Sequence, residues 1–364
     1  MRIWHVGASP SLKKVDGLSA TVWIVAGEQA LLGHQVALII NALPDEAALA
    51  LAKQTGLELI HVPVSNKRYD LKVLKPLMHS TPPEVVHMHS VFLPKQASLA
   101  MELVRNRIPY IITPNGGVDF RRGWLKKSLY SWLVEKSRFS AASAITVVTP
   151  KEEKPVRALV PRYRGIVRWV PNPVDACNLQ SWKGDTEPKR LVFLGRFDVL
   201  HKGIDILVDI ARLLPDVEFH LYGTEDAKTK EWLEQLQRNL SPNVHFHSPV
   251  FGTEKAQVLA GASLYIQTSR WEGFPLSIAE AMYVGLPCAM AETLNFAELF
   301  RQHDLGVVLP PNPQKAAIRL LEVLNQPALL QNWSERARAF ATAHFPPRAV
   351  AKGYLNLYEQ VLCR

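Results

Sequence analysis

The chain has 364 residues, of which 48% are hydrophobic and 21% are charged. These values are typical of globular proteins and exclude a disordered or fibrous chain, and the length suffices for two domains with separate cores. The formal net charge is +9; residues 1–180 carry 23 Lys and Arg against 13 Asp and Glu, and the remainder carries 19 against 20. We therefore expect a basic N-terminal half that attracts anionic ligands, lipid or nucleic acid.

The N-terminus and the cysteines indicate the compartment. No apolar run approaches the ~20 residues that span a bilayer, and residues 1–7 lack the apolar core of a signal peptide and predict a strand instead. Cys177, Cys288 and Cys363 are widely spaced and form neither a CxxC pair nor a metal-ligand pattern. We therefore expect a cytoplasmic protein with reduced thiols and no bound metal.

Short β-branched runs alternate with helical stretches along the whole chain. The predicted strands are residues 3–6, 35–40, 57–62, 84–89, 110–113, 144–148 and 166–170 in the first half, and 190–194, 217–222, 244–246, 264–267, 287–290 and 306–309 in the second. Among the predicted helices, residues 18–32 end at Gly33, a residue suited to a left-handed cap, and residues 350–362 form the last one. This alternation predicts parallel sheets covered on both faces.

The alternation pauses at residues 174–188, which contain Asp, Asn, Gly and Pro and show no periodicity. We therefore predict an α/β protein with two doubly wound, Rossmann-like domains that face each other across a cleft, with the boundary between residues 174 and 175. Ligands of such folds bind at the carboxyl ends of the strands.

Residues 269–282 carry the most informative pattern. They follow a predicted strand, and Gly273 and Pro275 break the chain into a turn before a helix. The free N–H groups at the start of that helix suit a phosphate or a sugar oxygen. Glu272 in the turn and Glu280 eight residues later can accept hydrogen bonds from the vicinal hydroxyls of a sugar or a ribose.

A second cluster, residues 195–203, also follows a strand and precedes a helix predicted from Ile204. Glycines flank Arg196 and Lys202 in this cluster. A loop that carries two cations at a helix start is suited to hold a diphosphate.

The ordered set of motifs resembles the group-1 family of retaining glycosyltransferases with the GT-B fold. The Gly-Arg…Lys-Gly loop and the later Glu-Gly-Phe…Glu-Ala-Met segment resemble the family's donor motifs, and their spacing fits. Further similar segments are residues 15–17, 33–36, 86–89 and 170–175. The last helix resembles the one that returns to the first domain in this family. The resemblance therefore assigns residues 1–174 and 347–364 to an acceptor-side domain and residues 175–346 to a donor-binding domain.

The resemblance implies a role for each matching position. Arg196 and Lys202 would hold the donor diphosphate and stabilise the charge that builds on it as the leaving group departs. Glu272 would contact the donor sugar, and His89 would lie near the acceptor, which completes the candidate catalytic set. The candidate donor-binding residues are Gly17, Asp16, Gly195, Gly273, Phe274, Pro275, Leu276 and Glu280, the last of which would bind the ribose. Asn115 and Gly116 would lie on the acceptor side.

Three positions depart from the family pattern. Asp16 replaces the first Gly of a loop near the phosphates and places an acid there. Pro275 replaces a second Gly and removes an N–H donor, which we interpret as a change in donor preference. Asn115 stands where related sequences often have His, and an amide cannot act as a base at neutral pH.

Plainer interpretations stay open for several residues. Arg196 and Lys202 are also compatible with an exposed charged pair, and most Glu residues on helices are surface acids. His89 ends a buried strand, where a histidine is often a core residue. We expect His87 to point to the opposite face of that strand and to be structural.

Residues 121–132 mix basic and aromatic side chains at helical spacing. They predict either an amphipathic helix with its aromatic rings toward the core or a patch that lies on anionic lipid. No recognised nucleic-acid motif is present, so we expect no nucleic-acid partner.

Together these patterns predict a glycosyltransferase that moves a hexose or N-acetylhexosamine from a UDP- or GDP-sugar to a glycan or lipid-linked glycan in cell-surface polysaccharide biosynthesis. The resemblance implies retention of configuration. No Asp-x-Asp pair follows a strand and the Arg/Lys loop can hold the diphosphate, so we expect a metal-independent enzyme without a cofactor. We place it in the cytoplasm or peripherally on the inner face of the membrane. The alternatives are a sugar-nucleotide epimerase or hydrolase of the same fold and a non-catalytic sugar-nucleotide-binding protein.

Overall fold

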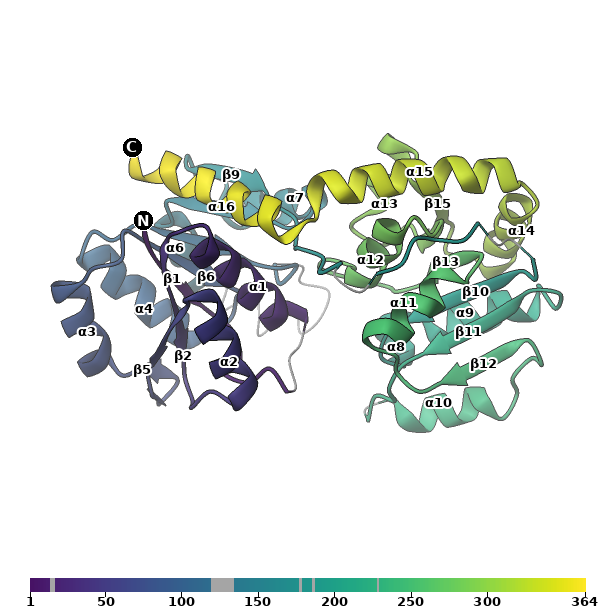
Figure 1. Ribbon diagram of the computed structural model, residues 1–364, viewed down its shortest axis with the longest axis horizontal. Coiled ribbons are helices and arrows are strands. Elements are labelled where there is room, and N and C mark those ends of the chain that lie inside the picture. The colour runs from purple at the N-terminus through teal and green to yellow at the C-terminus, as the bar shows by residue number, and fades with distance from the viewer. Residues whose placement is uncertain (14–16, 119–133, 177–178, 185–186, 228) are drawn as a thin grey trace. The chain divides into compact units, whose positions relative to one another are not determined.

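The computed structural model describes residues 1–13, 17–118, 134–176, 179–184, 187–227 and 229–364. The chain forms two compact units: unit 1 is Met1–Pro173 with Pro347–Arg364, and unit 2 is Val174–Pro346. Each unit contains a parallel sheet with helices on both of its faces (Figure 1).

Unit 1 contains a seven-stranded sheet in the order β3-β2-β1-β6-β7-β8-β9 and a two-stranded sheet, β4-β5. Its strands are β1 (Arg2–Val6), β2 (Gln35–Ile40), β3 (Glu58–His61), β4 (Val64–Ser65), β5 (Arg68–Tyr69), β6 (Val85–His89), β7 (Tyr110–Thr113), β8 (Ala144–Val147) and β9 (Ile166–Trp169). Its described helices are α1 (Gly17–Leu31), α2 (Glu46–Thr55), α3 (Leu71–Ser80), α4 (Pro94–Arg105), α6 (Lys136–Ser140), the 3-10 turn η2 (Pro150–Glu152), α7 (Glu153–Leu159) and α16 (Pro347–Leu362).

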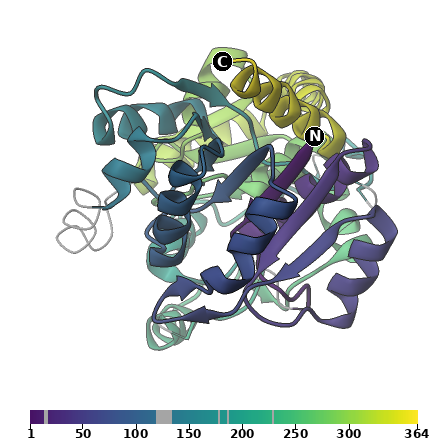
Figure 2. The same cartoon turned by 90° about the vertical axis from the view of Figure 1, so that its left-hand side faces the viewer.

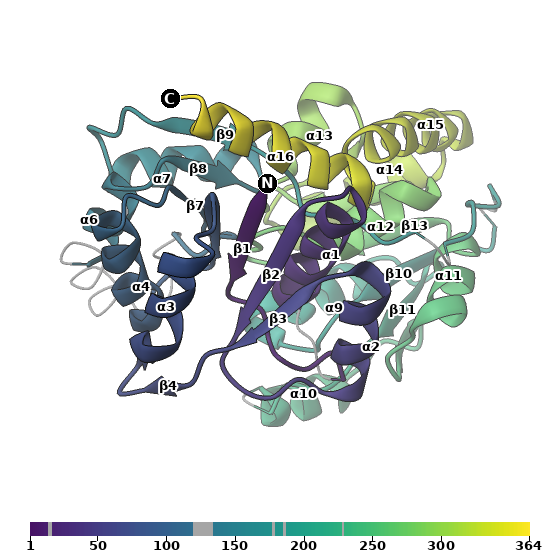
Figure 3. The same ribbon diagram turned by 60° about the vertical axis from the view of Figure 1, so that its left-hand side comes forward.

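The strands of unit 1 are apolar on both faces because each face packs against helices. Ile3 and Leu38 belong to the core that contains α1, α2 and α16, whereas Trp4 and Ile39 belong to the opposite core, with α3 and α4. Helix α16 packs against α1, and Figures 2 and 3 show this yellow helix beside the purple N-terminal elements. The last residues of the chain therefore complete the fold of the first unit.

Unit 2 contains a six-stranded sheet in the order β12-β11-β10-β13-β14-β15. Its strands are β10 (Arg190–Leu194), β11 (Glu218–Tyr222), β12 (Val244–His247), β13 (Leu264–Gln267), β14 (Cys288–Ala291) and β15 (Gly306–Leu309). Its described helices are α8 (Val199–Lys202), α9 (Ile204–Arg212), α10 (Lys230–Gln237), α11 (Gly252–Ala260), α12 (Leu276–Val284), α13 (Ala297–His303), α14 (Pro313–Leu324) and α15 (Pro327–His344).

One face of this sheet packs against α9 and α14 in a core that includes Phe193 and Phe219. On the other face, α12 packs against β13 and β14. None of the helices in the described part of the chain is long and apolar enough to cross a membrane.

The predicted α/β class with two doubly wound parallel sheets is confirmed. All thirteen predicted strands are present, with ends that differ by one residue at most. The helix predicted for residues 18–32 is α1, and Gly33 after it has a φ of +91°. The short strands β4 and β5 were not predicted, because two-residue strands leave no periodicity.

Candidate functional site

The two motifs of unit 2 meet where the strand order of the sheet reverses. Strands β10 and β13 are parallel neighbours, with Leu191 opposite Leu264, and the chain connections on the two sides of this point run in opposite directions. Such a reversal leaves a crevice outside the carboxyl ends of the two strands, where ligands of doubly wound folds bind. Residues 195–203 follow β10 and residues 268–275 follow β13, so both candidate motifs start at this crevice.

The first motif contains a short helix that the sequence did not predict. Asp198 caps α8 by accepting a hydrogen bond from the His201 N–H at 2.9 Å. Gly203 ends α8 with a φ of +65°, and a Cβ at this position would lie 2.2 Å from the carbonyl oxygen of Thr268. Glycine is therefore required here both for its backbone conformation and for the contact between the two motifs. The motif is a capped turn that fixes Lys202, rather than an open loop.

Lys202 and Glu272 form the centre of the site. The Lys202 Nζ donates to Glu272 Oε1 at 2.6 Å, and the side chains of Gln267 and Ser269 donate to the same oxygen at 2.8 and 2.9 Å. The side chains of Lys202 and Glu272 are 15% and 10% exposed, so the pair is shielded and its position is well defined. Glu272 Oε2 lies 3.9 Å from His201 Nε2 and accepts no hydrogen bond from the described residues.

His201 orients the second motif. Its Nε2 donates to the Trp271 carbonyl at 2.9 Å, which fixes the tautomer, and its ring stacks on that of Trp271 with centroids 4.7 Å apart. Burial lowers the pKa of His201, so the ring is neutral at physiological pH. No sequence pattern predicts a role for His201, because its partner lies 70 residues further along the chain.

A second ion pair braces the same two motifs. Arg270 binds both carboxylate oxygens of Asp205 at 2.9 and 2.6 Å and also donates to the carbonyl of Leu200 at 2.9 Å. Bidentate pairs of this kind fix orientation as well as distance. Neither Arg270 nor Asp205 was predicted as a site residue.

Arg196 precedes α8 in the first motif and is exposed. Its side chain is 59% exposed and its Nη1 lies 3.2 Å from Asp226 Oδ2. Gly195 before it makes a close backbone approach to Gly223, where a Cβ would lie 1.8 Å from the Gly195 carbonyl oxygen. The first motif therefore carries one exposed cation, Arg196, and one shielded cation, Lys202.

The start of α12 is formed by the predicted turn. Pro275 stands immediately before α12 and provides no side-chain cap. The Leu276 N–H, to which the resemblance assigns a contact with the donor sugar, donates to the Phe274 carbonyl at 3.0 Å in this structure. Asn295 donates to the Gly273 carbonyl at 3.3 Å and holds the turn.

Glu280 lies on α12 and pairs with a lysine that was not predicted. The Lys255 Nζ on α11 lies 2.7 Å from Glu280 Oε1, and the two side chains are 25% and 21% exposed. One carboxylate oxygen is therefore held while the side chain stays accessible, as a ligand for hydroxyl groups requires.

Three histidines gather at the corresponding strand reversal of unit 1, between β1 and β6. His5 hydrogen-bonds His89 at 3.0 Å and Gln29 at 2.8 Å, and His87 hydrogen-bonds the Tyr358 hydroxyl at 2.6 Å. The rings of His87 and His89 are 4.0 Å apart. The prediction that His87 points away from His89 was wrong, because side chains alternate along a strand and residues two apart share a face.

The histidine cluster is buried and neutral. Burial lowers the pKa of His5 to about 4 and those of His87 and His89 well below their ordinary value. The His89 ring has no exposed surface, and its Nδ1 has no hydrogen-bond partner among the described residues. The ring nitrogens are close enough to hold a metal, but both nitrogens of His87 are already bonded, to Tyr358 and to Thr113. The cluster is therefore a hydrogen-bonded network inside unit 1.

Asn115 and Gly116 lie after β7, beside a buried acid that the sequence analysis missed. Asn115 has a φ of +54° and donates to the Thr113 carbonyl at 3.1 Å. The Glu152 carboxyl accepts hydrogen bonds from the Gly116 and Val148 N–H groups. Burial raises the pKa of Glu152 to about 7, against the opposing effect of these two donors.

Two predictions concern residues without a described structure. Asp16 lies outside the described residues, although its neighbour Gly17 is described as the first residue of α1. The basic and aromatic residues 121–132 also lie outside them, so the predicted lipid contact stays a prediction.

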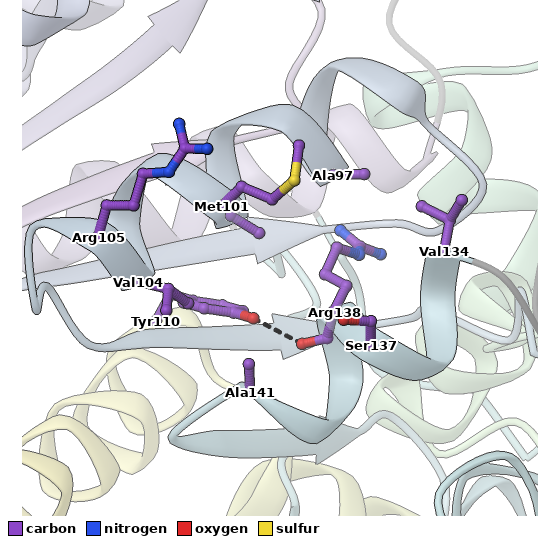
Figure 4. A pocket seen from close by; sticks show the side chains of 10 residues that line it. Ala97, Met101, Val104, Arg105, Tyr110, Val134, Ser137, Arg138 and Ala141 are labelled. Carbon is purple, nitrogen blue, oxygen red and sulfur yellow. Dashed lines mark hydrogen bonds between the residues drawn. The ribbon is translucent and has the colours of Figure 1, made fainter.

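A pocket of about 470 Å³ in unit 1 is a separate feature. Met101, Val104 and Tyr110 line it, and the Tyr110 hydroxyl donates to the Arg138 carbonyl at 2.6 Å (Figure 4). None of the predicted site residues lines this pocket, which is largely apolar. It does not belong to the crevice in unit 2.

Comparison with known families identifies the class of protein that this fold and site define. The family described as Glycosyl transferases group 1 matches residues 178–340, and the Glycosyl transferase 4-like domain matches residues 16–173. The two matches adjoin near the boundary between the units and together include most of the chain. The chain belongs to the group-1 glycosyltransferase family.

Individual relatives agree with this assignment. The chain is 27% identical over 206 residues to a phosphatidyl-myo-inositol mannosyltransferase of Mycobacterium tuberculosis, a match that covers 53% of each chain and so about half of that relative's length. It is 23% identical over 295 residues to the GDP-mannose:cellobiosyl-diphosphopolyprenol alpha-mannosyltransferase of Xanthomonas campestris, over 77% of this chain and 74% of the relative. The structure of Anabaena HepE in complex with UDP superposes with a TM-score of 0.79 at 17% identity, over 99% of this chain and 100% of that one. The fold is GT-B.

Proposed function

We propose that the chain transfers a hexose or N-acetylhexosamine from a UDP- or GDP-sugar to a glycan or lipid-linked glycan, with the donor bound in unit 2. The observation that carries the proposal is the shielded Lys202–Glu272 pair at the strand reversal, which is fixed by donors from Gln267 and Ser269. A shielded carboxylate oxygen that accepts no hydrogen bond from the described residues, such as Glu272 Oε2, costs free energy unless a ligand donates a hydrogen bond to it. Family membership and the diphosphopolyprenol acceptor named for one relative support the donor and acceptor classes.

The geometry suits cleavage of the bond between the anomeric carbon and the diphosphate. Lys202 and Arg196 would stabilise the negative charge on the departing diphosphate, because fixed cations need no reorganisation as the charge develops. Glu272 Oε2 would accept a hydrogen bond from a sugar hydroxyl, and Glu280 would accept those of the ribose.

The acceptor oxygen then forms the new bond to the anomeric carbon. Its proton passes to a phosphate oxygen of the leaving group, so that the step needs no base from the protein, and attack from the face of departure retains the configuration. The two cations do the work that a metal ion does in other transferases, so we propose that the reaction is metal-independent. The +9 net charge supports a peripheral position on an anionic membrane, where lipid-linked acceptors lie.

The first test is release of nucleoside diphosphate from a panel of UDP- and GDP-sugars, with and without membrane lipid extract. Lys202→Met removes the charge and keeps the length of the side chain, and we expect it to lower the rate by about a hundredfold. Lys230→Met is the matched control, because Lys230 is a 58% exposed lysine on α10 of the same unit. An equal rate in Lys202→Met would contradict the proposed role, and a change in the sugar without diphosphate release would instead identify an epimerase.

A further inference from the structure

A second cluster of titratable side chains lies on the edge of the unit 2 sheet, away from the residues of the donor site. Phe219 and Leu221 of β11 face the core, so Glu218 and His220, which alternate with them along the strand, face the other way. In the parallel pairing of β11 with the edge strand β12, His220 lies opposite His245. Residues opposite each other in adjacent strands share a face.

The side chains on this face are in contact. His245 Nε2 lies 2.6 Å from Glu218 Oε2, and His220 Nδ1 lies 2.9 Å from His247 Nε2. The His220 ring stacks on those of His245 and His247, at centroid distances of 4.9 and 5.2 Å, and the rings of His245 and His247 are 6.3 Å apart. Glu218, His220 and His245 each present one ligand atom, and these atoms lie within 4.8 Å of one another.

The cluster is open to solvent and therefore accessible to an ion. The side chains of His245 and Glu218 are 39% and 42% exposed. An edge strand is commonly protected by lysine, proline or a bulge, whereas this one presents two imidazoles on the same face.

The hydrogen bonds of the cluster occupy one nitrogen of His220. Its Nδ1 lies 2.9 Å from His247 Nε2, and an imidazole has a second nitrogen on the other side of the ring. Because Nδ1 of His220 is engaged by His247, its Nε2 remains for an ion.

We propose that Glu218, His220 and His245 bind a Zn²⁺ ion, with His247 holding the His220 ring in place. Tetrahedral zinc with bonds of about 2.0–2.1 Å separates its ligand atoms by about 3.3 Å, a value that side-chain rotation can reach from the observed spacing. Two imidazoles and one carboxylate favour zinc over Mg²⁺ or Ca²⁺, which prefer oxygen ligands. A hydrogen bond to the other nitrogen of a ligating histidine is the common way to orient it.

The ion would join the edge strand β12 to β11. None of its ligands belongs to the proposed donor site, so the proposal is compatible with metal-independent transfer and does not depend on the proposed function. Binding would stabilise unit 2 by mass action.

The test uses the full chain without an affinity tag, in a Cys363→Ser background because Cys363 is an exposed thiol. Zn²⁺ is titrated into chelator-treated protein by calorimetry, and the melting temperature is measured with and without the metal. The variant is His220→Asn with His245→Asn. The matched control is His61→Asn with His79→Asn, two exposed histidines of unit 1.

We expect about one Zn²⁺ per chain for the parent and the control, a metal-dependent rise in their melting temperature, and a Kd weakened by at least about a hundredfold in the double variant. Glu218→Gln keeps a hydrogen-bonding partner for His245 and should weaken binding with little effect on the apo protein. Co²⁺ bound to the parent should give the visible absorption of a tetrahedral site, which needs no variant. Absence of zinc binding by the parent, or undiminished binding by the double variant, would overturn the proposal.

Discussion

The buried histidine cluster makes unit 1 sensitive to acid, and His5 allows this to be measured. The perturbation is His5→Gln, an amide that can hydrogen-bond Gln29 and His89 but does not titrate. The pKa of His5 in the folded chain is lowered from 6.5 to about 4. Between pH 6.5 and 4 the histidine is therefore protonated in the unfolded chain and neutral in the folded chain. Stability that is fully present above pH 6.5 is consequently lost as the pH falls toward 4.

The magnitude follows from this lowering. The full effect is about 3 kcal/mol, and about 2 kcal/mol of it is already lost at pH 5. The loss of stability between pH 7.5 and pH 5 should therefore be smaller by about 2 kcal/mol in His5→Gln than in the parent. The comparison is made between proteins because Glu152 changes stability in the opposite direction over the same range.

The assay must report unit 1 alone, since a chain of two units need not unfold in one step. Hydrogen exchange of peptides from β1 and β6, followed by mass spectrometry in a series of urea concentrations at each pH, gives the opening free energy of that sheet. His61→Gln, an exposed histidine on β3 of the same sheet, is the matched control and should keep the parent's pH dependence. An identical pH dependence in His5→Gln and the parent would refute the reasoning.

Three further predictions concern single residues. The pKa of Glu152 is raised to about 7, so the stability of the folded chain decreases as the pH rises from 4.5 to 7. Glu152→Gln should remove this decrease, which is about 2 kcal/mol between pH 5 and pH 7.5. The same exchange experiment measures it. Gly203→Ala should destabilise unit 2 by at least about 2 kcal/mol in chemical denaturation, because backbone strain and a backbone clash add. Gly56 has the same left-handed conformation but open space around it, so Gly56→Ala should cost only about 1 kcal/mol. Lys255→Met should weaken nucleotide-sugar binding about fivefold in calorimetry, or about 1 kcal/mol, because the Glu280 carboxylate is then no longer held in position for the ribose. Unchanged affinity would contradict that role.

Local sequence patterns predicted the sheets well. Buried parallel strands are nearly continuous apolar runs, such as the five buried residues that follow Gln35 in β2, and this signal does not depend on the rest of the fold. The helix α8 was missed because four residues carry no periodicity, and its existence depends on the Asp198 cap and the conformation of Gly203. The predicted face of His87 was wrong although the sequence contains the necessary information, because residues two apart along a strand share a face.

The candidate site was predicted by position but not by its contacts. Lys202 and Glu272 stood out because each lies in a glycine-flanked turn after a strand. Lys255, the partner of Glu280, did not stand out, since it contacts Glu280 only after α11 packs against α12. The histidines of the proposed zinc site lie on two strands that are separated in sequence, and only the register of β11 and β12 brings them together.

The most direct test of the donor site is thermal stabilisation by a panel of UDP-, GDP-, ADP- and TDP-sugars. Arg196→Ala with Glu280→Ala removes the exposed cation and the proposed ribose ligand, and Arg212→Ala is the control, because Arg212 is an exposed arginine on α9. A ligand that binds only the folded state raises the melting temperature by mass action. We predict that one nucleotide class stabilises the parent and the control but not the double variant. Equal stabilisation of all three proteins would contradict a donor site in unit 2.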